Sequence, residues 1–287
     1  MTNRDQDSTP PGMGPDPGVL GELRQDRFLG PTDLTHWYTP WGRVLARAAR
    51  ELSARIGPYA TLLVTILVGA GIAGALSIIA AQVYDSVTDD EGVAGLDRPL
   101  LDFALTLRNP AANAIVTGFT DVAGTIGMPL IAVVAIIVLT IHRRSATPLV
   151  LIVAAGGGSL LMTVAGKEII NRERPPLTDA VPPYEHSPSF PSGHTLNAVV
   201  VIGMIAYLLI LRRHSRRARA AIGTTAVVFG LTVGLSRVFL GHHWFTDILA
   251  GWLLGAAWLS LIITTHRLYL TTRRHSDHPA TGPNEAE

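Results

Sequence analysis

Six long apolar segments constrain this chain more than any other feature of its sequence. Each is long enough to cross the hydrocarbon layer of a bilayer as an α-helix, which takes about 20 residues. They are residues Tyr59–Val83, Val122–Ile141, Pro148–Ile169, Thr195–Leu211, Ala220–Phe239 and Phe245–Thr265. Backbone polar groups in lipid must bond within their own segment. The sequence therefore predicts an all-α fold, a bundle of six transmembrane helices.

The composition agrees with a membrane protein and excludes several kinds of function. Charged residues make up 16% of the chain, whereas soluble domains average about 25%. The net charge of +1 gives no indication of a nucleic-acid partner. The chain has no cysteine, which excludes disulfides, thiolate metal sites and a cysteine nucleophile.

The polar ends of the sequence divide the chain into three parts. Residues 1–55 are expected to form a cytoplasmic tail, disordered up to about Pro31 and with an interfacial helix near its end. Residues 56–270 form the six-span domain, and residues 271–287 form a second disordered cytoplasmic tail. The weaker amphipathic stretch Leu100–Phe119 is expected to be an interfacial or re-entrant element outside the membrane.

Arginines cluster at one side of the predicted spans, and this sets the orientation. These residues are Arg43, Arg47, Arg50, Arg55, Arg143, Arg144, Arg212, Arg213, Arg216, Arg217, Arg219, Arg267, Arg273 and Arg274. Because cytoplasmic loops carry an excess of positive residues, we expect a multi-pass protein of the bacterial plasma membrane with both termini inside. Six cations depart from this rule and fall on the outer side: Arg98, Arg108, Lys167, Arg172, Arg174 and Arg237.

Three motifs fall at that same outer face and contain four of the six exceptional cations. The first, Lys167–Pro175, ends the third span, and the second, Pro191–His194, opens the fourth. The third, Ser236–Asp247, joins the fifth span to the sixth. The topology was set without using these motifs, so their meeting at one face predicts a common site there.

The positive charges in these motifs predict a site for phosphate. Lys167, Arg174 and Arg237 would repel one another in a confined and partly dehydrated place unless they shared an anionic ligand. Guanidinium groups match phosphate in a bidentate manner. Ser192 and Gly193 begin a predicted helix, where free N–H groups also favour anions.

Two histidines and one carboxylate in the motifs are the candidate catalytic groups. His243 and Asp247 are four residues apart, so they share a helix face and the carboxylate can orient the imidazole. The second ring nitrogen of His243 can then attack phosphorus, while His194 gives a proton to the leaving oxygen. The neighbouring His242 is a rival nucleophile, although about 140° of helix rotation separates it from Asp247. No carboxylates with metal-ligand spacing are visible, and we expect neither a metal nor another cofactor.

These residues resemble the type 2 phosphatidic acid phosphatase family, which is related to the vanadium haloperoxidases. The family pattern is Lys-x6-Arg-Pro, then Pro-Ser-Gly-His, then Ser-Arg-x5-His-x3-Asp, and all three parts are complete here between Lys167 and Asp247. The resemblance implies a phosphohistidine on His243, with His194 as general acid and then base and Asp247 orienting His243. It also implies phosphate contacts from Lys167, Arg174, Ser192, Gly193, His194 and Arg237.

The sequence thus predicts a metal-independent phosphatase that acts on a lipid phosphomonoester or diphosphate at the extracytoplasmic face. Candidate substrates are polyprenyl diphosphates, phosphatidic acid, diacylglycerol pyrophosphate and phosphatidylglycerol phosphate. Phosphate transfer to another acceptor and a non-catalytic lipid transporter remain alternatives. A solvated loop is favoured over head-group contacts for the residues Arg172, Glu173, Glu185 and His186. No protein partner is inferred.

Overall fold

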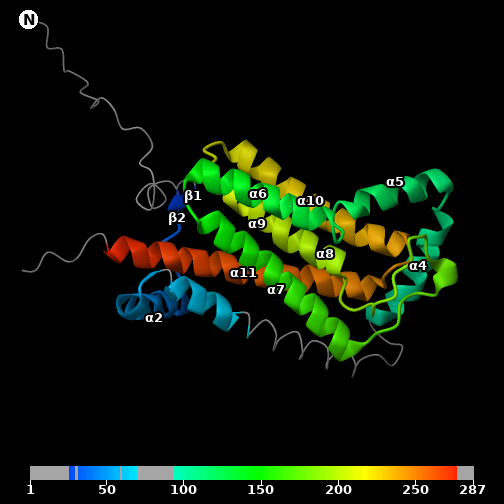
Figure 1. The fold of residues 1–287 in the computed structure, drawn as a ribbon, viewed down its shortest axis with the longest axis horizontal. Helices are drawn as coiled ribbons and strands as arrows, with labels where there is room; N and C mark the ends of the chain where they lie inside the picture. The colour runs from blue at the N-terminus through cyan, green and yellow to red at the C-terminus, as the bar shows by residue number, and fades with distance from the viewer. Residues whose placement is uncertain (1–25, 30–31, 59, 70, 72–92, 277–287) are drawn as a thin grey trace, which may run out of the picture.

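Long helices lying side by side make up most of the molecule (Figure 1). The structure, a computed structural model, describes residues 26–29, 32–58, 60–69, 71 and 93–276. The bundle is formed by α6 (Gly127–Arg143), α7 (Thr147–Ile170), α9 (Gly203–Leu211), α10 (Arg216–Phe239) and α11 (Phe245–Ser276). Short helices and loops collect at one end of it, with the N-terminal segment at the other.

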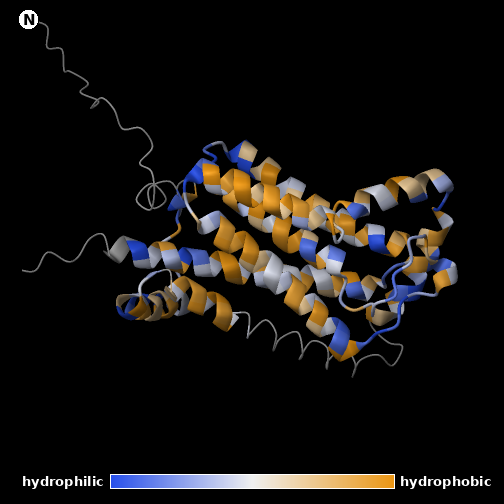
Figure 2. Cartoon of the chain, viewed as in Figure 1, coloured by the Kyte–Doolittle hydropathy of each residue, from blue (hydrophilic) through white to orange (hydrophobic). Residues whose placement is uncertain are grey.

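Four helical runs among the described residues are long and apolar enough to cross a membrane. They are Thr147–Ile170, Gly193–Leu211, Arg216–Phe239 and Phe245–Arg273. They correspond to the last four predicted spans, and apolar residues follow their length in Figure 2. Two further apolar helices, Ala60–Gly69 and Gly127–Arg143, are shorter.

The first predicted span is described only in part, and the second begins later than predicted. Most of Tyr59–Val83 lies outside the described residues, which include its helical part Ala60–Gly69. The second span begins at Gly127 rather than Val122, because a turn after α5 occupies the residues between them. A count of six spans is therefore not established.

The run from Gly193 to Leu211 changes its helical pitch near its start. It begins as α8 (Gly193–Asn197), continues through the π-helical turn η3 (Ala198–Ile202) and ends as α9. Single π turns inside α-helices occur frequently at functional sites. Here the turn begins at Ala198, one helical turn after the Pro191–His194 motif.

The predicted interfacial stretch Leu100–Phe119 is two helices rather than one element. They are α4 (Asp97–Thr106) and α5 (Pro110–Asp121), preceded by the 3-10 turn η1 (Val93–Leu96). Asn109 is extended, and its side-chain oxygen accepts from the Ala112 amide at 2.9 Å. The residue before a proline avoids the helical region, and Asn is a strong N-cap. Asn109 therefore ends the first helix and starts the second.

The N-terminal segment is more ordered than the sequence indicated. A two-stranded antiparallel ladder, β1 (Phe28–Leu29) with β2 (Thr32–Asp33), is a small departure from an all-α fold. Asp26 lies within the stretch predicted to be disordered, yet it is fully buried. It accepts from Arg143 Nη1 and from Arg212 Nε, each at 2.9 Å. Paired charges hold this part of the predicted tail against the bundle.

Helix α2 (Pro40–Ile56) lies where a helix near the end of the tail was expected, and it packs against α11. Thr39 caps it by accepting from the Gly42 amide at 3.1 Å. Helix α11 itself continues to Ser276, past the predicted start of the C-terminal tail at residue 271. Contacts with the N-terminal segment extend it, among them a hydrogen bond from Trp37 Nε1 to Thr271 Oγ1 at 3.1 Å.

The main hydrophobic core lies between α7, α11 and the run from Gly193 to Leu211. Its fully buried side chains include Leu151, Leu196, Met204 and Ile262. Trp258 on α11 is 2% exposed, and its indole N–H donates to Ala155 O on α7 at 3.3 Å. This packing fixes the helix ends that carry the three motifs.

Candidate active site

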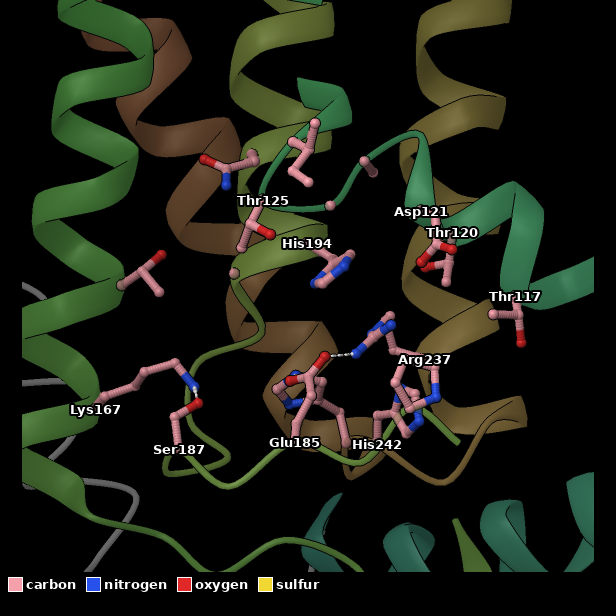
Figure 3. A pocket seen from close by; sticks show the side chains of 18 of the residues that line it. Thr117, Thr120, Asp121, Thr125, Lys167, Glu185, Ser187, His194, Arg237 and His242 are labelled. Atoms are coloured by element: carbon pink, nitrogen blue, oxygen red, sulfur yellow. Dashed lines mark hydrogen bonds and ion pairs between the residues drawn. The ribbon is translucent and has the colours of Figure 1, made fainter. Parts of the chain in front are cut away.

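A cavity of about 740 Å³ lies at the end of the bundle where α4, α5 and the long loops collect. Its wall is built by the turn after α5, the end of α7, the start of α8, the end of α10 and the loop before Pro191. Five residues predicted for the site line it: Lys167, Gly193, His194, Arg237 and His243. Figure 3 shows Lys167, His194 and Arg237 reaching the cavity from three different helices. The fold thus brings the three motifs together at one place.

His243 and Asp247 form a buried pair. His243 Nδ1 lies 3.4 Å from Asp247 Oδ2, and Asp247 is fully buried. The same carboxylate oxygen accepts from the Trp244 amide at 2.9 Å and from the Ser189 hydroxyl. Arg174 Nη1 lies 3.2 Å from His243 Nε2. An arginine can only donate, so Nε2 accepts and Nδ1 carries the proton toward Asp247.

Burial keeps the His243 ring neutral. It lowers the pKa of His243 to about 4, although the hydrogen bond to Asp247 and its negative charge act in the opposite direction. Desolvation penalises the charged imidazolium, and for a fully enclosed ring this effect outweighs one nearby carboxylate. At neutral pH, His243 Nε2 therefore keeps the lone pair that a nucleophile needs.

A glycine turn places this histidine. Helix α10 ends at Phe239, and Gly241 then adopts a φ of +71°, in the left-handed region. A side-chain carbon at Gly241 would also approach Asp179 O to 2.1 Å. Glycine alone adopts this conformation without steric cost, so the turn that leads the chain to His243 depends on it.

A carboxylate lies between two of the predicted phosphate-binding arginines. Glu185 Oε2 accepts from Arg174 Nη2 at 2.8 Å, and Glu185 Oε1 forms an ion pair with Arg237 Nη2. We call Arg174, Glu185 and Arg237 the site triad. Figure 3 shows Glu185 between Arg237 and the Lys167 side. Burial by itself would raise the pKa of Glu185, but the surrounding positive charges, above all Arg237, lower it to about 2.

Lys167 is held by local hydrogen bonds, whereas Arg237 keeps one donor without a partner among the described residues. Lys167 Nζ donates to Ser187 Oγ at 3.0 Å and to Pro188 O. Arg237 is 2% exposed, and its Nε is buried without a hydrogen-bond partner among the described residues. An unpaired donor inside a dehydrated site is costly. This free donor, next to a cavity, marks a place where an oxyanion would be stabilised.

His194 and His242 occupy different positions in the cavity wall. Figure 3 shows the His194 imidazole pointing into the cavity, toward Arg237. His242 Nε2 lies 2.6 Å from Val181 O, to which it can only donate. His242 also has no hydrogen bond to Asp247 among the described residues. A carboxylate orients His243, whereas a backbone carbonyl holds the rival histidine.

Ser192 lies behind the cavity wall rather than in it. It is fully buried, its amide donates to Asp247 O at 3.2 Å, and its hydroxyl accepts from Thr195 at 2.9 Å. The start of α8 is thereby tied to the first turn of α11. A phosphate contact from the Ser192 side chain stays a prediction, while Gly193 lines the cavity.

The loop between the first two motifs makes more contacts at the site than the sequence predicts. Arg172 Nη1 donates to Asp247 Oδ1 at 2.5 Å and to Thr246 Oγ1 at 2.8 Å, and Arg172 Nη2 donates to Asp97 Oδ2 at 2.7 Å. The prediction of a solvated loop does not fit Arg172 or Glu185, which are half-buried and form ion pairs. It does fit Glu173 and His186, whose side chains are exposed. The signal for Arg172 was its departure from the orientation rule, because an outer-face arginine needs a local partner.

No group of three or more His, Asp or Glu side chains in the described part of the chain is arranged to hold a metal ion. The cavity is instead lined by Lys167, Arg237, four histidines and two carboxylates, Asp121 and Glu185, of which Glu185 is bound to two arginines. A membrane helix bundle with basic side chains around a cavity and a neutral, carboxylate-oriented histidine has the features of a membrane-bound phosphatase.

Comparison with known proteins gives the family. Residues 145–269 match the model of the PAP2 superfamily. Phosphatidylglycerophosphatase B of Bacillus subtilis is 34% identical over 184 residues, which cover 62% of this chain and 84% of that protein. Undecaprenyl-diphosphatase BcrC of the same species is 39% identical over 67 residues, or 23% of this chain and 30% of that protein.

A solved structure supports the same family assignment. The crystal structure of a transmembrane PAP2 type phosphatidylglycerolphosphate phosphatase from Bacillus subtilis superposes with a TM-score of 0.57 and 28% identity. The match covers 71% of this chain and 93% of that one. The chain belongs to the PAP2 superfamily, as a multi-pass membrane phosphatase of the kind found in bacteria.

Proposed function

We propose that this chain hydrolyses a lipid phosphomonoester or diphosphate through a phosphohistidine on His243. The observation that carries the proposal is the placement of His243 Nε2, 3.2 Å from Arg174, beside a cavity that Lys167, His194 and Arg237 also line. The relatives named phosphatidylglycerophosphatase and undecaprenyl-diphosphatase support a lipid as the substrate.

In the first step, His243 Nε2 attacks phosphorus while the bond from phosphorus to the lipid oxygen breaks. His194 gives its proton to the leaving oxygen, and the dephosphorylated lipid departs. The positive groups of Lys167, Arg174 and Arg237 stabilise the charge on the non-bridging oxygens. Phosphoryl transfer depends mainly on such positioning and charge stabilisation.

In the second step, water attacks the phosphohistidine. His194 accepts the water proton, the nitrogen–phosphorus bond breaks and inorganic phosphate is released. Asp247 holds the Nδ1 proton in both steps and stabilises positive charge on the ring. Arg172 and Ser189 position Asp247, because both donate hydrogen bonds to its carboxylate.

Glu185 must give way before a phosphate can bind between the two arginines. Its carboxylate makes the contacts that two phosphate oxygens would make. The residue belongs to the loop before Pro191, and its side chain is 29% exposed. An incoming phosphate therefore exchanges one anion for another, and the arginines never face each other without a counter-charge.

The outer leaflet is the proposed source of the substrate, with the active site extracytoplasmic and both termini inside. The positive-inside distribution of arginines supports this orientation. Apolar residues of the cavity wall, among them Ile126 and Leu160, offer a surface for the lipid chain. Phosphatidylglycerol phosphate and a polyprenyl diphosphate are the preferred substrates, and the reaction uses no metal.

Phosphate release by the purified full-length protein tests this proposal. A panel of lipid phosphates and diphosphates in detergent, with a chelator present, should yield phosphate, and vanadate should inhibit it as a mimic of pentacoordinate phosphorus. His243→Ala and His194→Ala should lower the rate by at least about 10³-fold. His242→Gln, which keeps a donor for Val181, is the matched control. Near-normal activity of His243→Ala, or activity lost on chelation, would refute the corresponding part.

A further inference from the structure

Helix α2, at the end of the bundle away from the catalytic cavity, has three distinct faces (Figure 1). The face against α11 is buried and carries small residues: Gly42, Ala46, Ala49 and Ser53. A second face is apolar and exposed, with Trp41, Val44, Leu45 and Ile56. Such an amphipathic helix lies at a membrane interface with its apolar face in the lipid.

The third face carries three arginines together with Ala54, and Glu51 lies at its edge. Residues advance by about 100° around a helix, so Arg43, Arg47 and Arg50 project on the same side. They border a cavity of about 270 Å³. The lining residues are Thr35, His36, Trp37, Arg43, Ala46, Arg47, Arg50 and Thr271, and none of them is acidic. Within the described ranges, no carboxylate forms an ion pair with these three arginines.

The floor of this cavity is a fixed aromatic ring. Trp37 donates its indole N–H to Thr271 on α11, and the Arg267 guanidinium lies 4.4 Å from the ring centre. A side-chain carbon at Gly42 would approach Trp37 Cε3 to 2.7 Å. The glycine therefore lets the ring lie flat between α2 and α11. The cavity is a built feature with two rigid sides.

We propose that this cavity binds the phosphate-bearing head group of an anionic phospholipid, in the leaflet at that end of the bundle. Charge complementarity is the first reason, because Arg43, Arg47 and Arg50 are positive groups without a carboxylate partner and guanidinium binds phosphate in a bidentate manner. Basic residues on amphipathic helices next to a membrane commonly recognise anionic lipids.

The second reason is the exposed apolar face of α2, which lies about 160° around the helix from the arginines. Trp41 is 80% exposed and Leu45 is 49% exposed, so this face can enter the lipid and hold the arginines at the depth of the phosphate groups. A free anion would have no use for this face. The site is separate from the catalytic cavity, with which it shares no lining residue.

Native mass spectrometry of the purified full chain tests the site with short-chain phosphatidylglycerol as the probe and phosphatidylcholine as the zwitterionic reference. The variant Arg43→Gln/Arg47→Gln/Arg50→Gln should bind phosphatidylglycerol more weakly by about fivefold per arginine, on the order of a hundredfold in total. Binding of phosphatidylcholine and kcat in mixed micelles should stay unchanged, which also shows that the variant folds.

The matched control is Arg216→Gln/Arg217→Gln/Arg219→Gln, which removes the same charge from the start of α10, outside the cavity. It should keep wild-type affinity for phosphatidylglycerol. Equal affinity of the two triple variants would overturn the proposal. So would full displacement of the lipid by millimolar inorganic phosphate, because the site would then bind the free anion rather than a lipid.

Discussion

Two groups of buried arginines, one at each end of the bundle, are built from the same parts and differ in what surrounds them. At the catalytic end, Arg174 and Arg237 share Glu185. At the other end, Arg143 and Arg212 share Asp26. We call the second group the tail triad, because Asp26 comes from the N-terminal segment.

The carboxylates of the two triads, Asp26 and Glu185, differ in how exposed their side chains are. The Asp26 side chain is fully buried and that of its partner Arg143 is 1% exposed, whereas the Arg212 side chain is 21% exposed, so the carboxylate of the tail triad is enclosed. Glu185 is 29% exposed, belongs to a loop and borders a large cavity. The same charge pattern therefore ties segments together where it is enclosed, and it fits the proposed exchangeable anion site where a loop carboxylate faces a cavity.

The largest expected effect is on catalysis at the site triad. Arg237→Gln should lower kcat/KM by about 10³-fold, because a charge-stabilising donor at the phosphate is lost. Thermal unfolding in detergent should change little, since Glu185 keeps Arg174 as a partner. Arg237→Lys, which retains the charge but not the planar fork, should give an intermediate rate. A variant with normal kcat/KM would remove Arg237 from the phosphate site.

The equivalent arginine substitution at the tail triad should lower the stability of the fold and leave catalysis largely unchanged. Arg143→Gln leaves Asp26 with one partner in a buried place and should cost about 3 kcal/mol, or a fall in Tm of roughly 10 °C. The kcat/KM of the folded fraction should stay within about twofold of wild type. If activity fell as far as in Arg237→Gln, the distinction between the two triads would be wrong.

Glu185→Gln tests the difference between the two triads through the affinity for phosphate. Without the negative charge of Glu185, inorganic phosphate should inhibit about tenfold more strongly, because the ligand no longer competes with a resident carboxylate. Inhibition assays measure this directly. Asp26→Asn is the matched control and should leave the phosphate inhibition constant unchanged. Weaker inhibition of Glu185→Gln would mean that Glu185 helps to bind phosphate rather than occupying its place.

The smallest effect concerns pH. With the pKa of His243 lowered to about 4, its ring stays neutral from pH 7 down to pH 5. Titration of the nucleophile should therefore cause no loss of kcat/KM in that range, and the acid limb should appear near pH 4. Glu185, with its pKa lowered to about 2, remains charged throughout. An acid limb near 6.5 would show that burial does not govern His243.

The motifs predicted which side chains meet, but not how they are held. Apolar length gave the last four spans, and the placement of Lys167, His194, Arg237 and His243 at one cavity follows from helix ends that share a face. The role of Glu185 was not predictable, since its partners come from segments 11 and 52 residues away. Pairing across a loop depends on tertiary packing, which leaves no periodic signal in the sequence.

The same reason explains why the contacts of Asp26 were not predicted, while residues 1–25 lie outside the described part of the chain. Polar residues before Pro31 carry no helical or strand periodicity, so composition alone indicated disorder. One carboxylate, Asp26, reaches two arginines more than 100 residues away along the chain. A single buried ion pair is invisible to any count of residue types. Arg172, by contrast, was predictable from the sequence, because an arginine on the outer side of the membrane departs from the positive-inside rule.

The length of α11 has a consequence for how the two phosphate-binding cavities can be used. Asp247 lies in its first turn and Thr271 near its end, about 36 Å apart at 1.5 Å per residue. The hydrocarbon layer of a bilayer is only about 30 Å thick. A lipid bound at the proposed site beside Thr271 would thus lie a full membrane thickness from His243, so the two proposed sites could be occupied at once without competing.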